Sequence, residues 1–454
     1  AVYSDLRRTG FFKSSNALLD QFVESTVWSA RSNFLDIPTD CPTRERHGWT
    51  GDAQIFFDTA GWLFDCASFF RKYVQDMYDW QRKDGCLPQI VPEGGVDFYM
   101  DAMNGSVGWA DAGVLIPYRF WKRYGDRSIL EKYYKGMKKY ARFMMKRCGK
   151  HTLLSKPLRI PHGYRKYAVN AGQSYGEWAE PADVHPNKWT DMVLPHPEVS
   201  TAYTSFVMGH MAEIAAELGE DADHDLYREY ARQVRRSYQA IRSLPEFTLD
   251  TDRQAMLVRP LYMGLLDTEG RKYAQERLVK ALDHYGWRLG TGFLSTPLIL
   301  DVLSEIDIGY AYRLLENEEM PGWLFMPKHG ATTIWESWEG TEAQNGIASL
   351  NHYSKGAVCA WLFETMCGIR IDGENHFLLS PKPGGSFTYA GASYDSIYGT
   401  VACRWERSDA GVRYTAEIPP NTSARVELPG MEPFEVKAGK YEWMAETEKM
   451  TQKK

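Results

Sequence analysis

One stretch near the N-terminus gathers side chains that can do chemistry on a polar ligand. Residues 37–52 read I-P-T-D-C-P-T-R-E-R-H-G-W-T-G-D, with three carboxylates, three basic side chains and one indole. Two prolines and two glycines interrupt the stretch, which predicts a loop rather than a buried helix. The side chains concerned are Asp40, Arg44, Glu45, Arg46, His47, Trp49 and Asp52.

This set of groups is suited to holding a sugar. Carboxylates accept hydrogen bonds from hydroxyl groups, a guanidinium donates in a fixed fork, and an indole face packs on the apolar side of a pyranose. Simpler interpretations stay open for single residues, because Asp52 could cap the helix that follows. Glu45 could likewise form a solvated ion pair with a neighbouring arginine. The cluster as a whole favours sugar binding.

A second stretch, residues 332–340, places Glu336 and Glu339 beside Trp335 and Trp338, and His352 follows after a short polar connection. If this stretch closes over the same cleft as the first, Glu45 faces one of these glutamates. Paired carboxylates across a sugar are the groups used in glycoside hydrolysis, in which one acts as an acid and the other as a base or nucleophile. The alternative is that the tryptophans are core residues and the glutamates are solvated.

The composition excludes several classes of protein. The 454 residues carry 53 Lys and Arg against 59 Asp and Glu, a net charge of −6. The sequence contains no block of basic residues, so nucleic-acid binding is not expected. No apolar run is long enough to cross a membrane. Seven cysteines without C-x-x-C spacing argue against a disulfide framework and a structural zinc site, and no ligand cluster calls for another metal or a cofactor.

The periodicity predicts a mainly α-helical first domain, residues 1–370, and a small second domain, residues 371–454. Apolar residues recur at helical spacing in many segments joined by short connections, and no fixed-period repeat is present, which favours a closed ring of antiparallel helix pairs. The long irregular region 150–197, which includes Q-S-Y-G-E-W, is expected to be functional. After residue 371, alternating apolar and polar residues predict a small antiparallel β-sandwich.

Three separated motifs, in the same order, resemble the catalytic domain of the inverting α-L-rhamnosidases of glycoside hydrolase family 78. They are W-S-A-R-S-N-F-L-D-I-P-T-D-C-P-T-R-E-R-H-G-W-T-G-D-A-Q at 28–54, G-A-T-T-I-W-E-S-W-E-G at 330–340 and L-N-H-Y at 350–353. The resemblance runs from about Tyr3 to the C-terminus and implies an (α/α)6 toroid followed by a C-terminal β-domain. Family members usually carry β-sandwich domains before the toroid, whereas this chain begins almost at the first toroid helix. We therefore expect part of a longer protein or a short member.

The resemblance also implies roles for single residues. Glu45 matches the general acid and Glu336 the general base that activates water, with about 6.5–9.5 Å between the two carboxyl groups. Glu339 matches an acidic position that is not the base. The positions that match sugar-binding residues are Asp40, Arg44, Trp49, Asp52, Trp109, Trp178 and His352. The pKa of Glu45 should be raised by a partly dry pocket and nearby carboxylates, and the charge of Arg44 should oppose this.

The expected substrate is a glycoside, oligosaccharide or polysaccharide that carries terminal α-L-rhamnose. Two alternatives are a toroidal glycosidase acting on another sugar and a rhamnose-binding protein without catalysis, and a polysaccharide lyase is a weaker third. The sequence does not determine the group that carries the rhamnose, the oligomeric state or the compartment. No signal peptide is visible, and the chain begins Ala-Val-Tyr-Ser without a methionine.

Overall fold

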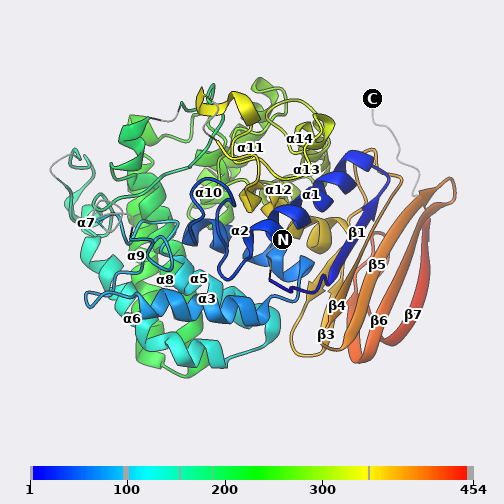
Figure 1. Ribbon diagram of the computed structural model, residues 1–454. Helices are drawn as coiled ribbons and strands as arrows, with labels where there is room; N and C mark the ends of the chain where they lie inside the picture. The colour runs from blue at the N-terminus through cyan, green and yellow to red at the C-terminus, as the bar shows by residue number, and fades with distance from the viewer. Residues whose placement is uncertain (1–3, 96–101, 153–154, 187, 346–347, 447–454) are drawn as a thin grey trace.

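A computed structural model of the chain describes residues 4–95, 102–152, 155–186, 188–345 and 348–446. Two layers of helices form a ring, and a β-sheet covers one side of it (Figure 1). Within the described residues, no helix is both long and apolar enough to cross a membrane.

The helices follow the predicted periodic segments closely. α1 begins at Ala17 because the side chain of Asn16 accepts hydrogen bonds from the backbone N–H groups of Leu18 and Leu19 at 3.0 and 3.1 Å. The α-helices are α1 (Ala17–Asn33), α2 (Thr50–Leu63), α3 (Ala67–Asp79), α5 (Ala112–Tyr124), α6 (Ser128–Arg147), α7 (His162–Arg165), α8 (Pro197–Leu218), α9 (Asp221–Ile241), α10 (Ala255–Tyr262), α11 (Thr268–His284), α12 (Ile299–Ile306), α13 (Ile308–Leu315), α14 (Phe325–Lys328) and α15 (Cys359–Trp361). The short 3-10 and π segments are η1 (Trp189–Met192), η2 (Pro245–Phe247), η3 (Gly340–Asn345), η4 (Tyr353–Val358) and η5 (Leu362–Met366).

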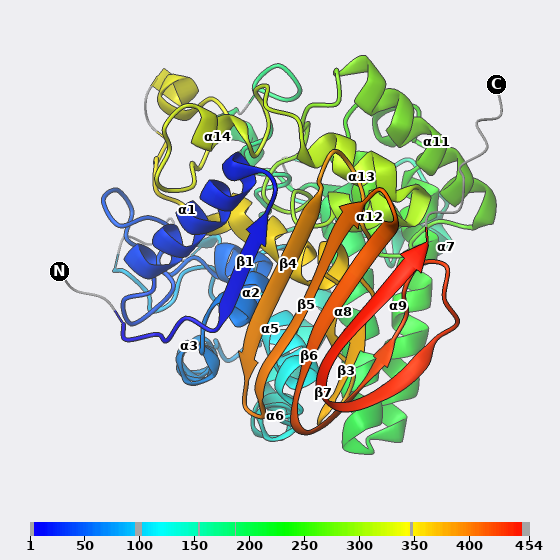
Figure 2. The same cartoon turned by 90° about the vertical axis from the view of Figure 1, so that its right-hand side faces the viewer.

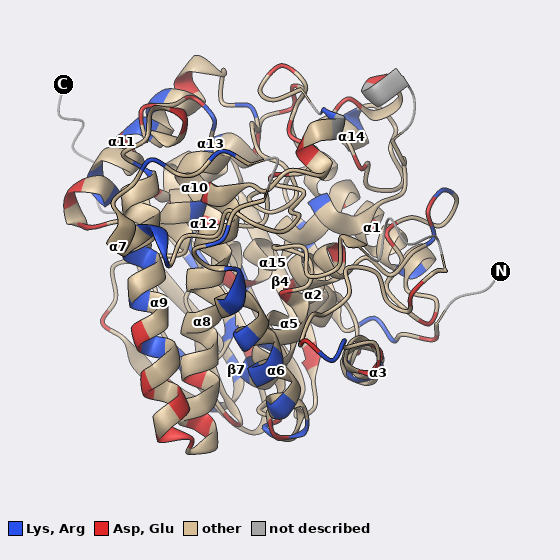
Figure 3. Cartoon of the chain, turned by 90° about the vertical axis from the view of Figure 1, so that its left-hand side faces the viewer, with Lys and Arg blue, Asp and Glu red and all other residues tan. Residues whose placement is uncertain are grey.

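Buried and amphipathic helices alternate along the chain, which gives the ring its two layers. α2 and α10 are buried on nearly all sides, whereas α3, α6, α9 and α11 bury one face and expose the other. Figure 3 shows charged residues along α6 and α9, while α8 beside them is mostly uncharged. The ring closes where α2 packs against η4, so the first and last helices of the inner layer are neighbours.

The sheet contains β1 (Gly10–Ser14), β2 (Ile369–Ile371), β3 (His376–Leu379), β4 (Tyr389–Ser396), β5 (Gly399–Ser408), β6 (Gly411–Val426) and β7 (Phe434–Glu446). Its order is β1-β4-β5-β6-β3-β2, with β7 paired to β6. The N-terminal strand β1 lies beside β4 at one edge (Figure 2). The segment before the first helix therefore belongs to the sheet, so the sheet is not built from residues after 371 alone.

This sheet differs from the predicted antiparallel β-sandwich in two respects. The described strands hydrogen-bond into one sheet, and β3 pairs with β6 in parallel rather than antiparallel orientation. Pro419 and Pro420 interrupt β6 without ending it, because β7 pairs with both of its halves across an irregularity between Ile418 and Ser423. The first half of β6 pairs with β5 and the second with β3, which keeps the sheet continuous.

The helical ring and the sheet share one apolar core. Trp62, at the end of α2, stacks on Phe363 and meets the edge of Tyr394 from β4. The indole N–H of Trp405, on β5, donates to the backbone carbonyl of Met366 at 2.9 Å. The sheet is thus fixed to the helices that close the ring.

We predict that removing the buried aromatic side chain of β1 destabilises the whole fold. Phe12 is 8% exposed and packs near Phe363, whereas its neighbour Phe11 is 47% exposed. Phe12→Ala should lower the free energy of unfolding by about 3 kcal/mol, because it leaves a cavity between sheet and helices. Phe11→Ala should change it by less than about 1 kcal/mol. Urea denaturation of both variants checks this, and equal effects would contradict it.

Candidate active site

The pocket lies at the N-terminal ends of the inner helices. It has a volume of about 260 Å³, and its lining residues come from the segments that precede α2, α5, α8, α12 and η4, and from the first turn of α2. The lining residues are Asp40, Glu45, Trp49, Asp52, Met103, Trp109, Tyr175, Trp178, Met192, Phe293, Glu336 and His352. Chain segments far apart in sequence therefore converge on one small cavity.

Every site residue predicted from sequence lines this pocket except Arg44. Arg44 is exposed on the loop before α2, although its positive charge still acts on the adjacent Glu45. Asp52 does not cap α2, because it lies inside the first turn and its carboxylate is turned to another partner. Glu339 lies outside the lining and accepts a hydrogen bond from the backbone N–H of Ala182 at 2.9 Å.

The acidic loop before α2 is held by backbone hydrogen bonds around Asp40. The N–H of His47 donates to the Asp40 carboxylate at 2.9 Å, and the N–H of Asp40 donates to the carbonyl of His47 at 2.9 Å. The loop then turns at Arg46, whose φ of 57° lies in the left-handed region. This closed turn presents Glu45 to the pocket.

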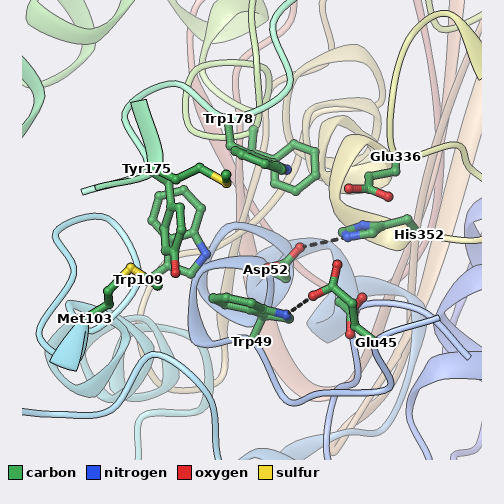
Figure 4. A pocket seen from close by; sticks show the side chains of 12 residues that line it. Glu45, Trp49, Asp52, Met103, Trp109, Tyr175, Trp178, Glu336 and His352 are labelled. Atoms are coloured by element: carbon green, nitrogen blue, oxygen red, sulfur yellow. Dashed lines mark hydrogen bonds and ion pairs between the residues drawn. The ribbon is translucent and has the colours of Figure 1, made fainter. Parts of the chain in front are cut away.

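Glu45 is oriented by an indole. The Nε1–H of Trp49 donates to Oε2 of Glu45 at 2.6 Å, a contact drawn as a dashed line in Figure 4. Glu45 is accessible to solvent at the mouth of the pocket, yet desolvation by its surroundings raises its pKa, the negative charge of Glu336 raises it further, and the hydrogen bond from Trp49 opposes both. The predicted rise in the pKa of Glu45 is confirmed, and the carboxylate that contributes to it is Glu336 from the second motif.

Glu336 is positioned by a second backbone connection. Its N–H donates to the carbonyl of Ser349 at 2.9 Å, and the N–H of Ser349 donates to Oε2 of Glu336 at 2.8 Å. The N–H of His352 donates to the carbonyl of Ile334 at 2.7 Å, so the segments 334–336 and 349–352 run side by side. In Figure 4, Glu336 lies above and Glu45 below, with His352 between them and Asp52 closer to the centre of the pocket.

Asp52, His352 and Ser354 form a buried polar cluster in which the Ser354 hydroxyl hydrogen-bonds to both other side chains. Oδ1 of Asp52 accepts from the Ser354 hydroxyl at 2.6 Å and lies 3.3 Å from Nε2 of His352, whose Nδ1 is 3.0 Å from the same hydroxyl. Burial raises the pKa of Asp52 well above its ordinary value and lowers the pKa of His352 to about 4. The imidazole is therefore uncharged at neutral pH.

Asp40 is a further buried carboxyl group at the pocket. It is 2% exposed, and burial raises its pKa to about 7, with the negative charge of Glu45 adding to the effect. At least one of the two carboxyl groups of Asp40 and Glu45 is therefore favoured in its protonated form near neutral pH.

Aromatic and sulfur-containing side chains form the opposite wall (Figure 4). Tyr175 lies at its centre, with ring centroids 4.7 Å from Trp109, 5.6 Å from Trp49 and 6.1 Å from Trp178. Sequence reasoning identified the stretch that contains Tyr175 but not the residue. It missed Met103, Met192 and Phe293, because single apolar residues in irregular segments carry no periodic signal.

Buried polar contacts hold this wall in place. The N–H of Phe293 donates to the carbonyl of Trp178 at 2.8 Å, and the N–H of Ser295 donates to Glu177 at 2.6 Å. Glu177 also forms an ion pair with the buried Arg259 at 2.5 Å. The aromatic faces around the pocket are therefore fixed before a ligand binds.

Comparison with known proteins agrees with this geometry. The family model of the bacterial α-L-rhamnosidase six-hairpin glycosidase domain matches residues 7–366, and that of the bacterial α-L-rhamnosidase C-terminal domain matches residues 371–442. An α-L-rhamnosidase of Streptomyces avermitilis is 32% identical over 436 residues, which cover 94% of this chain and 39% of the relative. An α-L-rhamnosidase of Formosa agariphila is 32% identical over 439 residues, which cover 94% of this chain and 45% of the relative.

The crystal structure of Streptomyces avermitilis α-L-rhamnosidase complexed with L-rhamnose has a TM-score of 0.82 to this structure at 30% identity. The similarity covers 96% of this chain and 42% of that one. This chain thus spans less than half the length of these relatives. The predicted toroid followed by a β-domain is confirmed, and the division at residue 370 stays a prediction. The chain belongs to the bacterial α-L-rhamnosidase family with a six-hairpin glycosidase domain.

Proposed function

We propose that this chain hydrolyses glycosides that carry terminal α-L-rhamnose, with inversion at the anomeric carbon. The observation that carries the proposal is the presence of Glu45 and Glu336 in one small pocket, where desolvation and the charge of Glu336 raise the pKa of Glu45. One carboxyl group is thereby favoured as an acid, as glycoside hydrolysis requires. Family membership supports rhamnose as the sugar.

In this proposal Glu45 is the general acid and Glu336 the general base. Glu45 gives its proton to the glycosidic oxygen as the bond from that oxygen to C1 breaks. Glu336 takes a proton from a water molecule, whose oxygen bonds to C1 from the opposite face. The products are β-L-rhamnose and the free alcohol of the leaving group, and a second round requires the two carboxyl groups to exchange protons with water.

The remaining lining residues suit a single deoxy sugar. Asp40, Asp52 and His352 offer acceptors and donors for its hydroxyl groups, while the aromatic wall covers the apolar ring face and the methyl group. The small volume favours one terminal sugar unit over the middle of a polymer. Arg44, which is exposed at the rim, would reach the sugar only by a side-chain rearrangement on binding.

The direct test is proton NMR of the protein acting on an aryl α-L-rhamnopyranoside, recorded before mutarotation. We expect β-L-rhamnose to appear first. Initial α-L-rhamnose would contradict inversion and require a nucleophile. Release from other aryl glycosides but not from the rhamnoside would favour a different sugar, and binding of rhamnose without release would favour a sugar-binding protein. An unsaturated product that absorbs in the near ultraviolet would indicate a lyase.

Glu45→Gln and Glu336→Gln should each lower kcat/KM for an unactivated rhamnoside at least about 100-fold, because each removes a proton-transfer group. Rhamnose binding, measured by calorimetry, should be largely kept. Glu339→Gln is the matched control from the same segment, and it should retain most activity because Glu339 lies outside the pocket lining. Near-parental turnover by either pocket variant would contradict the assignment.

Trp49→Phe should move the alkaline limb of the kcat/KM profile to higher pH by about half a unit or more. The indole N–H stabilises the carboxylate form of Glu45, so its removal raises the pKa of Glu45 and the acid keeps its proton to higher pH. Sugar binding should weaken as well. Trp178→Phe, a change in the same pocket, should weaken binding without moving the limb. A limb that stays in place in Trp49→Phe would contradict the acid role.

A further inference from the structure

Gly51 lies in the first turn of α2, and the indole of Trp109 packs directly against it. A methyl group at Gly51 would lie 2.6 Å from Cγ of Trp109 and closer still to Cδ1 and Nε1. Non-bonded carbon atoms pack at about 3.5–4.0 Å, so alanine fits here only if the ring or the helix moves. Trp109 is 3% exposed and lines the pocket, as does Asp52, the residue that follows Gly51.

The backbone of Trp109 is tied to α2 and cannot easily withdraw. Its N–H donates to the carbonyl of Ser106 at 3.2 Å. The carbonyl of the preceding residue, Gly108, accepts from the side-chain amide of Gln54, on α2, at 3.1 Å. Gln54 is buried, so a shift of the backbone would break a hydrogen bond that water cannot replace.

The ring of Trp109 has a second fixed neighbour, Tyr175, whose ring centroid lies 4.7 Å away. The hydroxyl of Tyr175 donates to the side chain of Gln89 at 2.9 Å, and the backbone carbonyl of Gln89 accepts from the N–H of Thr50 at 2.9 Å. Thr50 is the neighbour of Gly51, so these contacts form a closed loop around the ring. The space that remains open beside Trp109 and Tyr175 is the pocket itself (Figure 4).

We propose that Gly51 is a positioning residue that sets the sugar specificity of the pocket. The absence of a side chain lets Trp109 lie against α2, and this close approach leaves room for the methyl group of the sugar. The inference rests on the proposed function, in which the aromatic wall covers that methyl group. A methyl group at Gly51 and the methyl group of rhamnose thus compete for the same space through the indole.

The test compares Gly51→Ala with the parent on an aryl α-L-rhamnopyranoside and an aryl α-L-lyxopyranoside. L-lyxose has the ring hydroxyl groups of L-rhamnose but no methyl group. Gly51→Ala should lower kcat/KM for the rhamnoside about tenfold or more, because the displaced ring narrows the pocket. For the lyxoside, kcat/KM should fall less than about threefold. Competitive inhibition by free L-rhamnose and L-lyxose gives the same comparison where turnover of the lyxoside is slow.

Gly209→Ala is the matched control. Gly209 also lies inside a helix, α8, and a methyl group there would meet no described atom within 4 Å. Both changes replace glycine by alanine in a helix, and the intrinsic preference of alanine for helices is the same in each. Gly209→Ala should leave kcat/KM for both substrates unchanged, and a loss equal to that of Gly51→Ala would overturn the inference.

A double-variant cycle shows whether Gly51 acts through Trp109. Trp109→Leu replaces the rigid ring by a flexible side chain that can make room for a methyl group. In this background Gly51→Ala should lower kcat/KM for the rhamnoside less than about threefold. If Gly51→Ala alone does not fold, the double variant should fold, because the clash is absent. Failure of both to fold, or an equal loss in the two backgrounds, would overturn the inference.

The remaining failures can be told apart. Absence of rhamnoside hydrolysis by the parent would overturn the proposed function itself. An active parent whose kcat/KM for the rhamnoside is unchanged by Gly51→Ala would overturn only the role of Gly51. An equal loss for the rhamnoside and the lyxoside would also overturn it, because the effect would then follow general packing rather than the fit of the methyl group.

Discussion

The arrangement of the pocket depends on the hydrogen bond that the Ser354 hydroxyl donates to Asp52. These two residues lie 302 positions apart in the sequence. Asp52 belongs to α2, the first helix of the inner layer, and Ser354 to η4, near the end of the helical domain. Closure of the ring makes these elements neighbours, and the buried polar cluster with His352 fixes their relative position. A polar contact of this kind is stable only when all its members are satisfied, which restricts the alternatives for both ends of the ring.

The second constraint is the gathering of acidic side chains around one small cavity, where Asp40 and Asp52 are buried and Glu45 is partly desolvated. Removal of water disfavours their charged forms, and each charge disfavours the next, so the protons are shared unequally among Asp40, Glu45 and Asp52. Donors such as the Trp49 indole partly offset this effect for one member. The pocket therefore holds chemically identical groups in different states, and their surroundings alone distinguish them.

The β-sheet supports this arrangement from outside the ring. The core residues of β4 and β5 pack on the end of α2, which carries Asp52, and on the helical segments that continue from η4, the element that begins directly after His352. The N-terminal strand β1 closes one edge of the sheet and leads directly into α1. Packing of the sheet thus restrains the two elements whose meeting forms the site.

Short-range patterns in the sequence determined the helices, the acidic loop and the polar residues of the pocket. Helix caps, apolar periodicity and clustered polar residues act over a few positions, so they can be read without the fold. The resemblance of three ordered motifs supplied the family and the pairing of Glu45 with Glu336. It placed Arg44 with the sugar-binding residues, whereas the structure leaves that side chain exposed outside the pocket lining.

Only the tertiary structure decided which distant residues share the pocket and what charge surrounds them. Tyr175 and Phe293 carry no local signal, and they reach the wall because separate loops converge at one end of the ring. β1 was missed because its partner β4 lies far along the chain. Likewise, the prolines of β6 are a local signal for a break, and only the fold shows that β7 pairs with β6 on both sides of them. Long-range packing and solvent exclusion arise from the whole fold, so no short stretch of sequence encodes them.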